Sequence, residues 1–380
     1  MTPGDMSAST RASSPAPARK RAIVVGLGNI GSHLVGHLAR LRDLGEMVLI
    51  DHDRFTAANL LSQAVTSRAV GRAKARVMAA LARRINPTIV VRAVVRKVED
   101  MPLGTLRADL IAACLDSLSA RQHVAEASWR LGVPLVDAGV QADGLLARVD
   151  VYVPGEQNAC MECGWDRSDY DRLEVSYPCK GGEVRPTPTG ATSSLGALAA
   201  SLQAIECERL IAGGPLDLGA SARRVVIDAR HHKLYPTVIR RNAACRVTDH
   251  RIWKIDALAP RSGHLTLADL LGLDGRPFNG AAGDLFVDGV PFVVGLTCVR
   301  CGTGRWPLRL RSSLAKRDLT CSCGGEMVAS GFDQVERLNI ASLPDDVHGW
   351  PLARLGVRPG DVVSISCSGT VRHYLMPEAI

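Results

Sequence analysis

A glycine-rich turn that joins a strand pattern to a helix pattern constrains this chain more than any other feature. Residues 22–25 form an apolar run typical of a buried strand, and the turn Gly26-x-Gly28-x-x-Gly31 follows at once. Such glycines let a nucleotide phosphate approach the free N–H groups of a helix N-terminus. Asp51, twenty positions after Gly31, stands where a ribose hydroxyl is held. The turn therefore predicts a nucleotide site, without distinguishing NAD from ATP.

Strand and helix patterns alternate after this turn. We expect strands over 47–50, 89–95, 110–115 and 134–138, and helices over 71–84 and 119–131. This alternation predicts a Rossmann-like, doubly wound α/β sheet that is parallel in its N-terminal half. Apolar and polar residues alternate over 145–153, which is typical of a half-exposed strand in an antiparallel C-terminal half. A helix over 192–211 and a strand over 225–229 are expected to follow.

Composition divides the chain into three parts. Residues 1–20 are rich in Ser, Ala, Pro, Thr and Arg without apolar periodicity, so we expect a disordered tail. Residues 21–255 carry the alternating pattern and form the expected nucleotide-binding domain. Short strands, Gly/Pro turns and five further cysteines follow, which predicts a small β-rich domain over 256–380.

Charge and hydropathy exclude several functions. The net charge is +8, but Arg is spread along the chain and aromatic residues are only 4%, so we do not expect nucleic acid to be the main partner. No apolar run reaches the roughly 18 residues that span a bilayer, and the N-terminus lacks a secretion signal. We therefore expect a cytoplasmic protein without membrane contact. Eleven cysteines in such a chain favour metal or thiol chemistry over disulfides.

A series of short motifs follows the turn in a fixed order. They are Asp51-His52-Asp53, Asn59-Leu60-Leu61-Ser62-Gln63, Gly71-Arg72-Ala73-Lys74-Ala75, Ile85-Asn86-Pro87 and Cys114-Leu115-Asp116-Ser117, with Arg121 after them. In order and spacing this series resembles the ThiF/MoeB/HesA family, bacterial relatives of ubiquitin-activating enzymes. The resemblance implies a homodimeric, ATP-dependent adenylyltransferase. Its implied substrate is the C-terminal carboxylate of a small ubiquitin-like or sulfur-carrier protein, or of a peptide.

The resemblance also implies roles for single residues. The nucleotide-binding positions correspond to Asp51, Asp53, Asn59, Gln63, Lys74 and Asp116. Asp51 would bind the ribose, Asn59 and Gln63 would lie near the phosphates, Lys74 would neutralise their charge, and Asp116 would hold Mg²⁺. Cations suit this chemistry because a carboxylate attacks a charged triphosphate. The plainer alternatives are a solvated helix lysine for Lys74 and a helix N-cap for Asp116.

The sequence departs from the family at two arginine positions. Ser62 stands where the family has Arg in an Asn-Leu-x-Arg-Gln motif, and no Arg-Tyr-x-Arg-Gln motif precedes the first strand. Possible substitutes are Arg68, Arg72 and the tail arginines Arg11, Arg19 and Arg21. A non-catalytic scaffold that binds a nucleotide or a carrier is therefore one alternative. An NAD-dependent oxidoreductase is another, although it leaves Lys74, Asp116 and the cysteines unexplained.

A cysteine knuckle in the middle of the chain suggests a metal site. Cys160-Met161-Glu162-Cys163 has the spacing of zinc ligands. The family closes this site with a second Cys-x-x-Cys, and here Cys245 matches its first thiolate while Thr248 replaces the second. His250 is then the best local candidate for the fourth ligand, because imidazole also suits Zn²⁺. The alternative is a set of cysteines without metal.

Cys179 lies between this knuckle and the helix over 192–211. It matches the family cysteine that forms a thiol adduct with the activated carrier in sulfur-transfer members. Lys180 beside it could lower the thiol pKa. The alternative is an inert thiol.

A second cysteine set lies in the C-terminal part. Cys298-x-x-Cys301 and Cys321-x-Cys323 resemble a zinc ribbon, although the second pair is one residue short of the common spacing. With all four thiols used as ligands no open position remains, so we expect a structural zinc site. The alternative is four free thiols.

Overall fold

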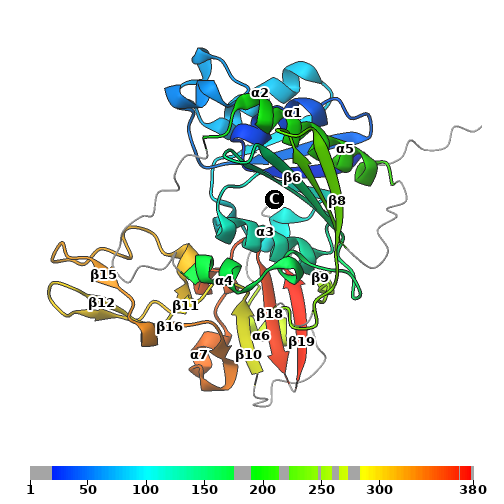
Figure 1. The fold of residues 1–380 in the computed structure, drawn as a ribbon. Coiled ribbons are helices and arrows are strands. Elements are labelled where there is room, and N and C mark those ends of the chain that lie inside the picture. The colour runs from blue at the N-terminus through cyan, green and yellow to red at the C-terminus, as the bar shows by residue number, and fades with distance from the viewer. Residues whose placement is uncertain are drawn as a thin grey trace, which may run out of the picture.

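The computed structural model describes residues 19–174, 190–213, 222–246, 250–258, 265–272, 283–367 and 369–377. Its N-terminal part is built on an eight-stranded sheet in the order β3-β2-β1-β4-β5-β6-β7-β8 (Figure 1). The pairs from β3 to β5 are parallel, and the pairs from β5 to β8 are antiparallel. The predicted sheet, parallel in one half and antiparallel in the other, is confirmed.

The strands of this sheet are β1 (Lys20–Val25), β2 (Leu44–Ile50), β3 (Val90–Val94), β4 (Leu110–Ala113), β5 (Leu135–Gln141), β6 (Leu146–Tyr152), β7 (Ala222–Asp228) and β8 (Lys233–Ile239). The accompanying helices are α1 (Asn29–Leu38), α2 (Lys74–Ile85), α3 (Leu118–Leu131), α4 (Arg167–Glu174) and α5 (Ser193–Ile211). α1, α2 and α5 pack on one face and α3 on the other, so the sheet separates two apolar cores.

Two glycines of the first turn are required by close backbone contacts. Gly26 has φ +86°, and a Cβ there would lie 2.5 Å from the carbonyl oxygen of Cys114. A Cβ on Gly31 would lie 2.0 Å from the carbonyl oxygen of Gly26. Gly28, the residue before α1, has only the Gln63 side chain near its own Cβ position, at 3.9 Å. The turn is therefore tightly packed on its protein side and open at Gly28.

Strand β6 corrects one expectation. We expected it to be half-exposed, but both of its faces are covered. Ala147, Val149 and Val151 pack in the core under α5, while Asp150 and Tyr152 are buried on the α3 face. The polar residues of this strand, Arg148 and Asp150, face charged side chains inside the protein.

The C-terminal part consists of small, mostly antiparallel sheets with their own apolar core. One five-stranded sheet has the order β17-β10-β18-β19-β9, and two three-stranded sheets have the orders β14-β11-β16 and β13-β12-β15. Within the larger sheet, β9 pairs with β19 in parallel. The predicted boundary at 255/256 falls within β9, so the division into domains stays a prediction.

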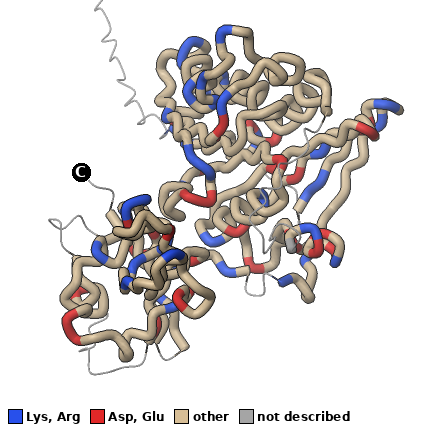
Figure 2. Tube along the Cα trace, turned by 90° about the vertical axis from the view of Figure 1, so that its left-hand side faces the viewer, with Lys and Arg blue, Asp and Glu red and all other residues tan. Residues whose placement is uncertain are grey.

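Their strands are β9 (Ile255–Ala257), β10 (Gly283–Val287), β11 (Phe292–Val293), β12 (Leu296–Cys298), β13 (Gly304–Arg305), β14 (Arg309–Leu310), β15 (Met327–Val328), β16 (Gln334–Val335), β17 (Leu338–Asn339), β18 (Val362–Cys367) and β19 (Thr370–Leu375). Two short helices are α6 (Leu267–Gly272) and α7 (Asp345–His348). None of the described helices is long and apolar enough to cross a membrane. Lys and Arg lie on both parts of the chain, with Asp and Glu between them (Figure 2).

The C-terminal part is joined to the N-terminal part at the end of α3. Arg130 of α3 forms an ion pair with Asp288, which follows β10, and its carbonyl accepts a hydrogen bond from the Trp253 amide at 2.9 Å. The Gly104 amide also donates to the carbonyl of Gly360 at 2.9 Å. These contacts bring the C-terminal sheet against the α3 side of the large sheet.

The two kinds of glycine predict two different mutational effects. Gly31→Ala should destabilise the protein by about 2–4 kcal/mol, because the new Cβ overlaps a backbone oxygen that cannot move freely. Gly28→Ala should cost less than about 1 kcal/mol, because its Cβ position is open. Thermal unfolding followed by circular dichroism would compare them. Equal melting temperatures for the two variants would contradict this packing.

Candidate functional site

The residues predicted to bind nucleotide follow strands that are neighbours in the sheet. The glycine turn follows β1, Asp51 follows β2, and Asp116 lies three residues after β4. β2 and β4 flank β1 on opposite sides, so this is the point where the strand order reverses. In open α/β sheets, ligands bind at the carboxyl ends of the strands at such a point. The structure therefore groups these residues where a ligand is expected.

Asp51 connects the glycine turn to the end of β2. One carboxylate oxygen accepts a hydrogen bond from the Leu27 amide at 2.7 Å, and the other accepts from the Asp53 amide at 2.8 Å. The carboxylate is buried and held by backbone donors on two segments. Its geometry fixes the turn relative to the following loop.

Gln63 is the side chain nearest to the open Gly28, with its amide nitrogen 3.9 Å from the Cβ position of that glycine. Its side-chain oxygen is buried and has no hydrogen-bond partner among the described residues. Unsatisfied buried polar atoms are costly, so a polar ligand beside Gly28 would suit Gln63. The Asn29 side chain instead packs against Gly196 and donates to the carbonyls of Ala191 and Thr192, both at 3.2 Å, which ties the start of α1 to the start of α5.

The Asn59 side chain forms a hydrogen bond with the backbone of its own segment. Its side-chain oxygen accepts from the Thr56 amide at 2.9 Å and closes a capping box on the short 3₁₀ helix Ala57–Leu61. Its carbonyl accepts from the Gln63 amide at 2.9 Å. Asn59 therefore holds the segment that places Gln63 beside the turn.

Lys74 is the first residue of α2 and is only 7% exposed. Its Nζ contacts the Asp53 carboxylate at 2.9 Å, and His52 lies 3.3 Å from the other oxygen of that carboxylate. The plain alternative of a solvated helix lysine is wrong. A buried ammonium is held instead at the carboxyl end of β2, next to Asp51 and Asp53.

Asp116 is exposed in the loop between β4 and α3. The N-cap of α3 is Ser117, whose hydroxyl accepts from the Ala120 amide at 3.3 Å. The alternative that Asp116 caps the helix is therefore wrong. Its carboxylate has no hydrogen-bond or ion-pair partner in the described part of the chain, which leaves both oxygens for a ligand.

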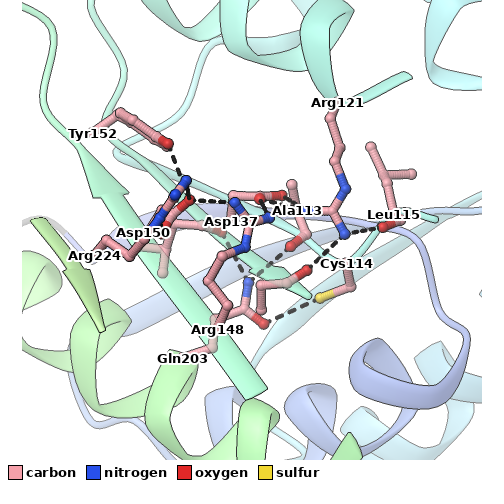
Figure 3. A network of polar contacts seen from close by, with 12 residues as sticks. Ala113, Cys114, Leu115, Arg121, Asp137, Arg148, Asp150, Tyr152, Gln203 and Arg224 are labelled. Carbon is pink, nitrogen blue, oxygen red and sulfur yellow. Dashed lines mark hydrogen bonds and ion pairs between the residues drawn. The ribbon is translucent and has the colours of Figure 1, made fainter. Parts of the chain in front are cut away.

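A buried ion network holds this loop in place (Figure 3). Asp137 and Asp150 are both 0% exposed on the α3 face of the sheet. Arg121, in the first turn of α3, contacts both oxygens of Asp137 and donates to the carbonyls of Leu115 and Ala138. Because Leu115 precedes Asp116, the guanidinium fixes the position of that loop on the sheet.

The network extends across β6 and β7. Arg148 bridges Asp137 at 2.7 Å and Asp150 at 2.6 Å, and Arg224 contacts both oxygens of Asp150 at 2.8 and 2.9 Å. The Tyr152 hydroxyl also donates to Asp150 at 3.1 Å. Burial and this carboxylate raise the pKa of Tyr152 well above its usual value. Three guanidiniums thus compensate two buried carboxylates, and every member is hydrogen-bonded.

Gln203 of α5 supports the same region from the opposite face of the sheet. Its amide donates to the carbonyls of Ala113 and Val136, at 3.0 and 2.9 Å, and its oxygen accepts from the Cys114 thiol at 3.2 Å. The sequence motifs did not indicate a role for Asp137, Arg148, Asp150 or Gln203. Two sequence features could have indicated this network. Asp137 stands within an apolar run, and the charged residues Arg148 and Asp150 alternate with apolar residues along β6.

The first cysteine set converges as predicted. Cys160 lies 3.6 Å from Cys245 and 3.8 Å from Cys163, sulfur to sulfur, and the Nε2 atom of His250 lies 3.3 Å from the Cys163 sulfur. All four ligand atoms are buried and lie within 4.8 Å of one another. Tetrahedral zinc with Zn–S bonds of about 2.3 Å requires sulfurs about 3.8 Å apart. The donor set therefore could hold a metal ion.

The four residues of this set interact closely with one another and with their surroundings. The hydrogen bond between Cys160 and Cys163 lowers the pKa of Cys163 and raises the pKa of Cys160, which donates it. The His250 ring packs edge-on against Trp129, with ring centres 5.4 Å apart. Its Nδ1 atom is buried and has no hydrogen-bond partner among the described residues.

The second cysteine set also converges. Cys298 lies 3.6 Å from Cys323, and Cys301 lies 3.6 Å from Cys321, beside the sheet β13-β12-β15. All four sulfurs lie within 4.8 Å of one another, so they too could hold a metal ion. Gly325 packs close to two of them, since a Cβ there would lie 2.8 Å from the Cys298 sulfur.

Cys179, Cys114 and Cys207 lie outside the two cysteine sets. Cys179 lies outside the described residues. Burial raises the pKa of Cys114 to about 12 and that of Cys207 well above its usual value, which favours the protonated thiol in both.

Comparison with known proteins identifies the class. A model of the ThiF family matches residues 17–247, more than half of the chain. The chain therefore belongs to the ThiF family.

Among its relatives, the sulfur carrier protein ThiS adenylyltransferase of Escherichia coli is 26% identical over 59% of this chain and 84% of its own length. The mouse adenylyltransferase and sulfurtransferase MOCS3 is 37% identical over 30% of this chain, which spans only 26% of that protein. A crystal structure of E. coli MccB with succinimide aligns with a TM-score of 0.49 at 24% identity, over 60% of this chain and 66% of MccB.

The buried network predicts a large cost for removing one carboxylate. Asp137→Asn should destabilise the protein by about 3–5 kcal/mol, because Arg121 and Arg148 would lose their common buried partner. Asp43→Asn, on the exposed loop before β2, is the matched control and should cost less than about 0.5 kcal/mol. Chemical denaturation followed by fluorescence would measure both. Equal midpoints would show that the network does not stabilise the fold.

The two cysteine sets predict the metal content. Purified protein should contain close to two zinc ions per chain, one for each set of four ligands. Cys163→Ser and Cys298→Ser should each remove about one zinc ion, measured by mass spectrometry of the metal. Protein without zinc, in which all thiols react with a titrating reagent, would eliminate both sites.

Proposed function

We propose that the chain is an ATP-dependent adenylyltransferase. Its substrate is the C-terminal carboxylate of a small ubiquitin-like or sulfur-carrier protein, or of a peptide. The observation that supports this most directly is the position of Asp116, an exposed and unpartnered carboxylate near the open Gly28 turn where the strand order reverses. Membership of the ThiF family favours adenylation over hydride transfer by an NAD-dependent oxidoreductase.

The proposed reaction needs charge compensation more than acid–base groups. A carboxylate oxygen of the substrate attacks the α-phosphorus of ATP and forms a new O–P bond. The bond from that phosphorus to the bridging oxygen breaks, and pyrophosphate leaves with the electron pair. The product is a mixed anhydride of the carboxylate and AMP. Since both reactants are anions, positioning and cationic groups supply most of the catalysis.

Each residue has a proposed part in this reaction. Gly26, Gly28 and Gly31 would admit the phosphates to the start of α1, and Asp51 would bind the ribose with Asp53 beside it. Lys74 would exchange its contact with Asp53 for a phosphate oxygen. Mg²⁺ held by Asp116 would supply further positive charge when bound.

Two exposed arginines support the proposal that the missing family arginines are replaced. Arg68 and Arg72 lie between the Gln63 segment and Lys74, and their side chains have no ion-pair partner in the described ranges. Ser62, in contrast, is the observation that favours the alternative of a non-catalytic scaffold. In that alternative the nucleotide or the carrier binds without being activated.

The proposal also includes two zinc sites, an acceptor cysteine and the cellular compartment. Cys160, Cys163, Cys245 and His250 would hold one structural Zn²⁺, and Cys298, Cys301, Cys321 and Cys323 a second. Cys179 would receive the activated carrier in a later transfer step. We further propose that the protein acts in the cytoplasm.

We also propose a homodimer. β8 is an edge strand of the large sheet, and six of its seven residues are exposed. Leu234 and Val238 on this strand are 56% and 58% exposed, and Ile205 of α5 is 52% exposed. An exposed apolar edge strand favours association with another chain, and a second copy would cover it.

Titration calorimetry with Mg-ATP, and separately with NAD⁺, tests the proposed function. Asp116→Ala should weaken ATP binding at least about tenfold, or 1.4 kcal/mol, while Asp43→Ala should leave it unchanged. No heat of binding is expected with NAD⁺. ATP-binding protein should then exchange pyrophosphate into ATP when a carrier that ends in Gly-Gly is added.

Binding of NAD⁺ without ATP would identify a dehydrogenase instead. If neither nucleotide binds, the absence of the two family arginines would explain the loss of nucleotide binding. The result would favour a non-catalytic scaffold. ATP binding unaffected by Asp116→Ala would remove that residue from the site.

A further inference from the structure

A cleft lies between α3 and the C-terminal sheet, away from the nucleotide site. Its volume is about 760 Å³, within the range of pockets that bind organic ligands. α3 and the knuckle segment form one wall, through residues such as Glu126 and Glu162. β10 and β19 form the other, through Phe286 and His373. Neither the proposed adenylation nor the cysteine sets account for this cleft.

The cleft carries an excess of positive charge. Five cations and three carboxylates line it, namely Arg130, Arg246, Arg251, Lys254 and Arg337 against Glu126, Glu162 and Asp288. All three carboxylates already have partners: Arg130 pairs with Glu126 and Asp288, while Gln122 and Tyr170 donate to Glu162 at 3.0 and 2.9 Å. The other four cations form no ion pair with any described residue. A ligand would therefore meet unpaired cations and no unpaired carboxylate.

Two of these cations are held in fixed orientations by aromatic rings. The Arg246 guanidinium lies 3.9 Å from the centre of the Tyr170 ring, and Arg337 lies 4.2 Å from that of Phe286. Stacking leaves the edges of a guanidinium free to donate in pairs, which is the geometry that carboxylates accept. Because the side chains are already ordered, a carboxylate ligand would lose less conformational entropy on binding.

The same walls carry exposed apolar groups. Ile252 and Val371 are 47% and 43% exposed and line the cleft together with Trp129 and Trp253. Trp253 is itself fixed, because it stacks on His373 with ring centres 3.9 Å apart. A single inorganic anion would leave these surfaces uncovered. A short polypeptide segment that alternates acidic and aliphatic side chains would cover both kinds of surface.

The position of α3 relates this cleft to the nucleotide site. α3 begins two residues after Asp116, and Gln122, Glu126 and Arg130 on the same helix line the cleft. α3 begins at Leu118, so at about 1.5 Å per residue Glu126 lies about 12 Å along the helix from the end next to Asp116. An extended chain covers that distance in about four residues.

We propose that this cleft binds an acidic segment of the polypeptide substrate, a few residues before the C-terminus that reacts. This proposal rests on the proposed adenylation, which requires a polypeptide carboxylate at the nucleotide site. The segment would place carboxylates on Arg246, Arg251, Lys254 and Arg337, and aliphatic side chains on Ile252 and Val371. The C-terminal part would thereby select substrates by charge, while the nucleotide site acts on the terminus.

Fluorescence anisotropy of the full-length protein tests this with a labelled peptide, Glu-Leu-Glu-Asp-Leu-Glu-Ser-Thr-Gly-Gly. The peptide should bind, and the version with Gln and Asn in place of Glu and Asp should bind at least tenfold more weakly. Lys254→Glu/Arg337→Glu should weaken binding of the acidic peptide at least tenfold. Lys316→Glu/Arg317→Glu changes the charge equally at exposed positions outside the cleft lining, and should leave binding within twofold.

Calorimetry with Mg-ATP on the same proteins separates this proposal from the proposed function. ATP binding with no peptide binding, or equal loss of peptide binding in both double variants, would overturn the cleft as a substrate site. Displacement of the peptide by a ten-residue oligothymidylate at equal concentration would also overturn it, in favour of a nucleic-acid site. Peptide binding without ATP binding would overturn the adenylation and leave the cleft as an acidic-peptide site.

Discussion

The buried pair of Arg121 and Asp137 is the interaction on which the candidate site depends. It joins the first turn of α3 to the middle of β5, and through the Leu115 carbonyl it also holds the loop that carries Asp116. Neither charge could remain buried alone, so the two elements are fixed to each other wherever the fold forms. Arg148, Asp150 and Arg224 extend this constraint across β6 and β7, into the antiparallel half of the sheet. The glycine turn thus belongs to the parallel half of the sheet, while Arg148 of the antiparallel half helps to hold Asp137 in place.

The sequence predicted features that depend on local patterns. The alternation of strand and helix patterns predicted the sheet. The spacing of Cys160 and Cys163, together with the family resemblance that added Cys245 and His250, predicted the convergence of these four residues. Three features escaped prediction because they depend on contacts between distant segments. The alternation in β6 indicated one exposed face, but Asp150 on that face meets Arg224, 74 residues later. The exposed edge strand β8 was not predicted, and the cleft requires Arg337 beside residues of α3.

α3 is common to both candidate sites. Its first turn lies in the ion network next to Asp116, and its last turn contacts Trp253 and Asp288 of the C-terminal part. Trp129 near that end also packs against His250, one of the four residues of the first cysteine set. One helix of 14 residues therefore connects the C-terminal part to the loop that carries Asp116.

The short path from His250 to β9 has a consequence for how the protein can be divided. The ThiF match ends at residue 247, before His250 contributes its ring to the cysteine set, and β9 begins only five residues after that histidine. A truncated protein that ends with the family match would lack the His250 ring, and a fragment that begins there would contain His250 without the three cysteines it meets. Because β9 pairs with β19, a fragment that keeps His250 and β9 in their present contacts also needs the C-terminal sheet.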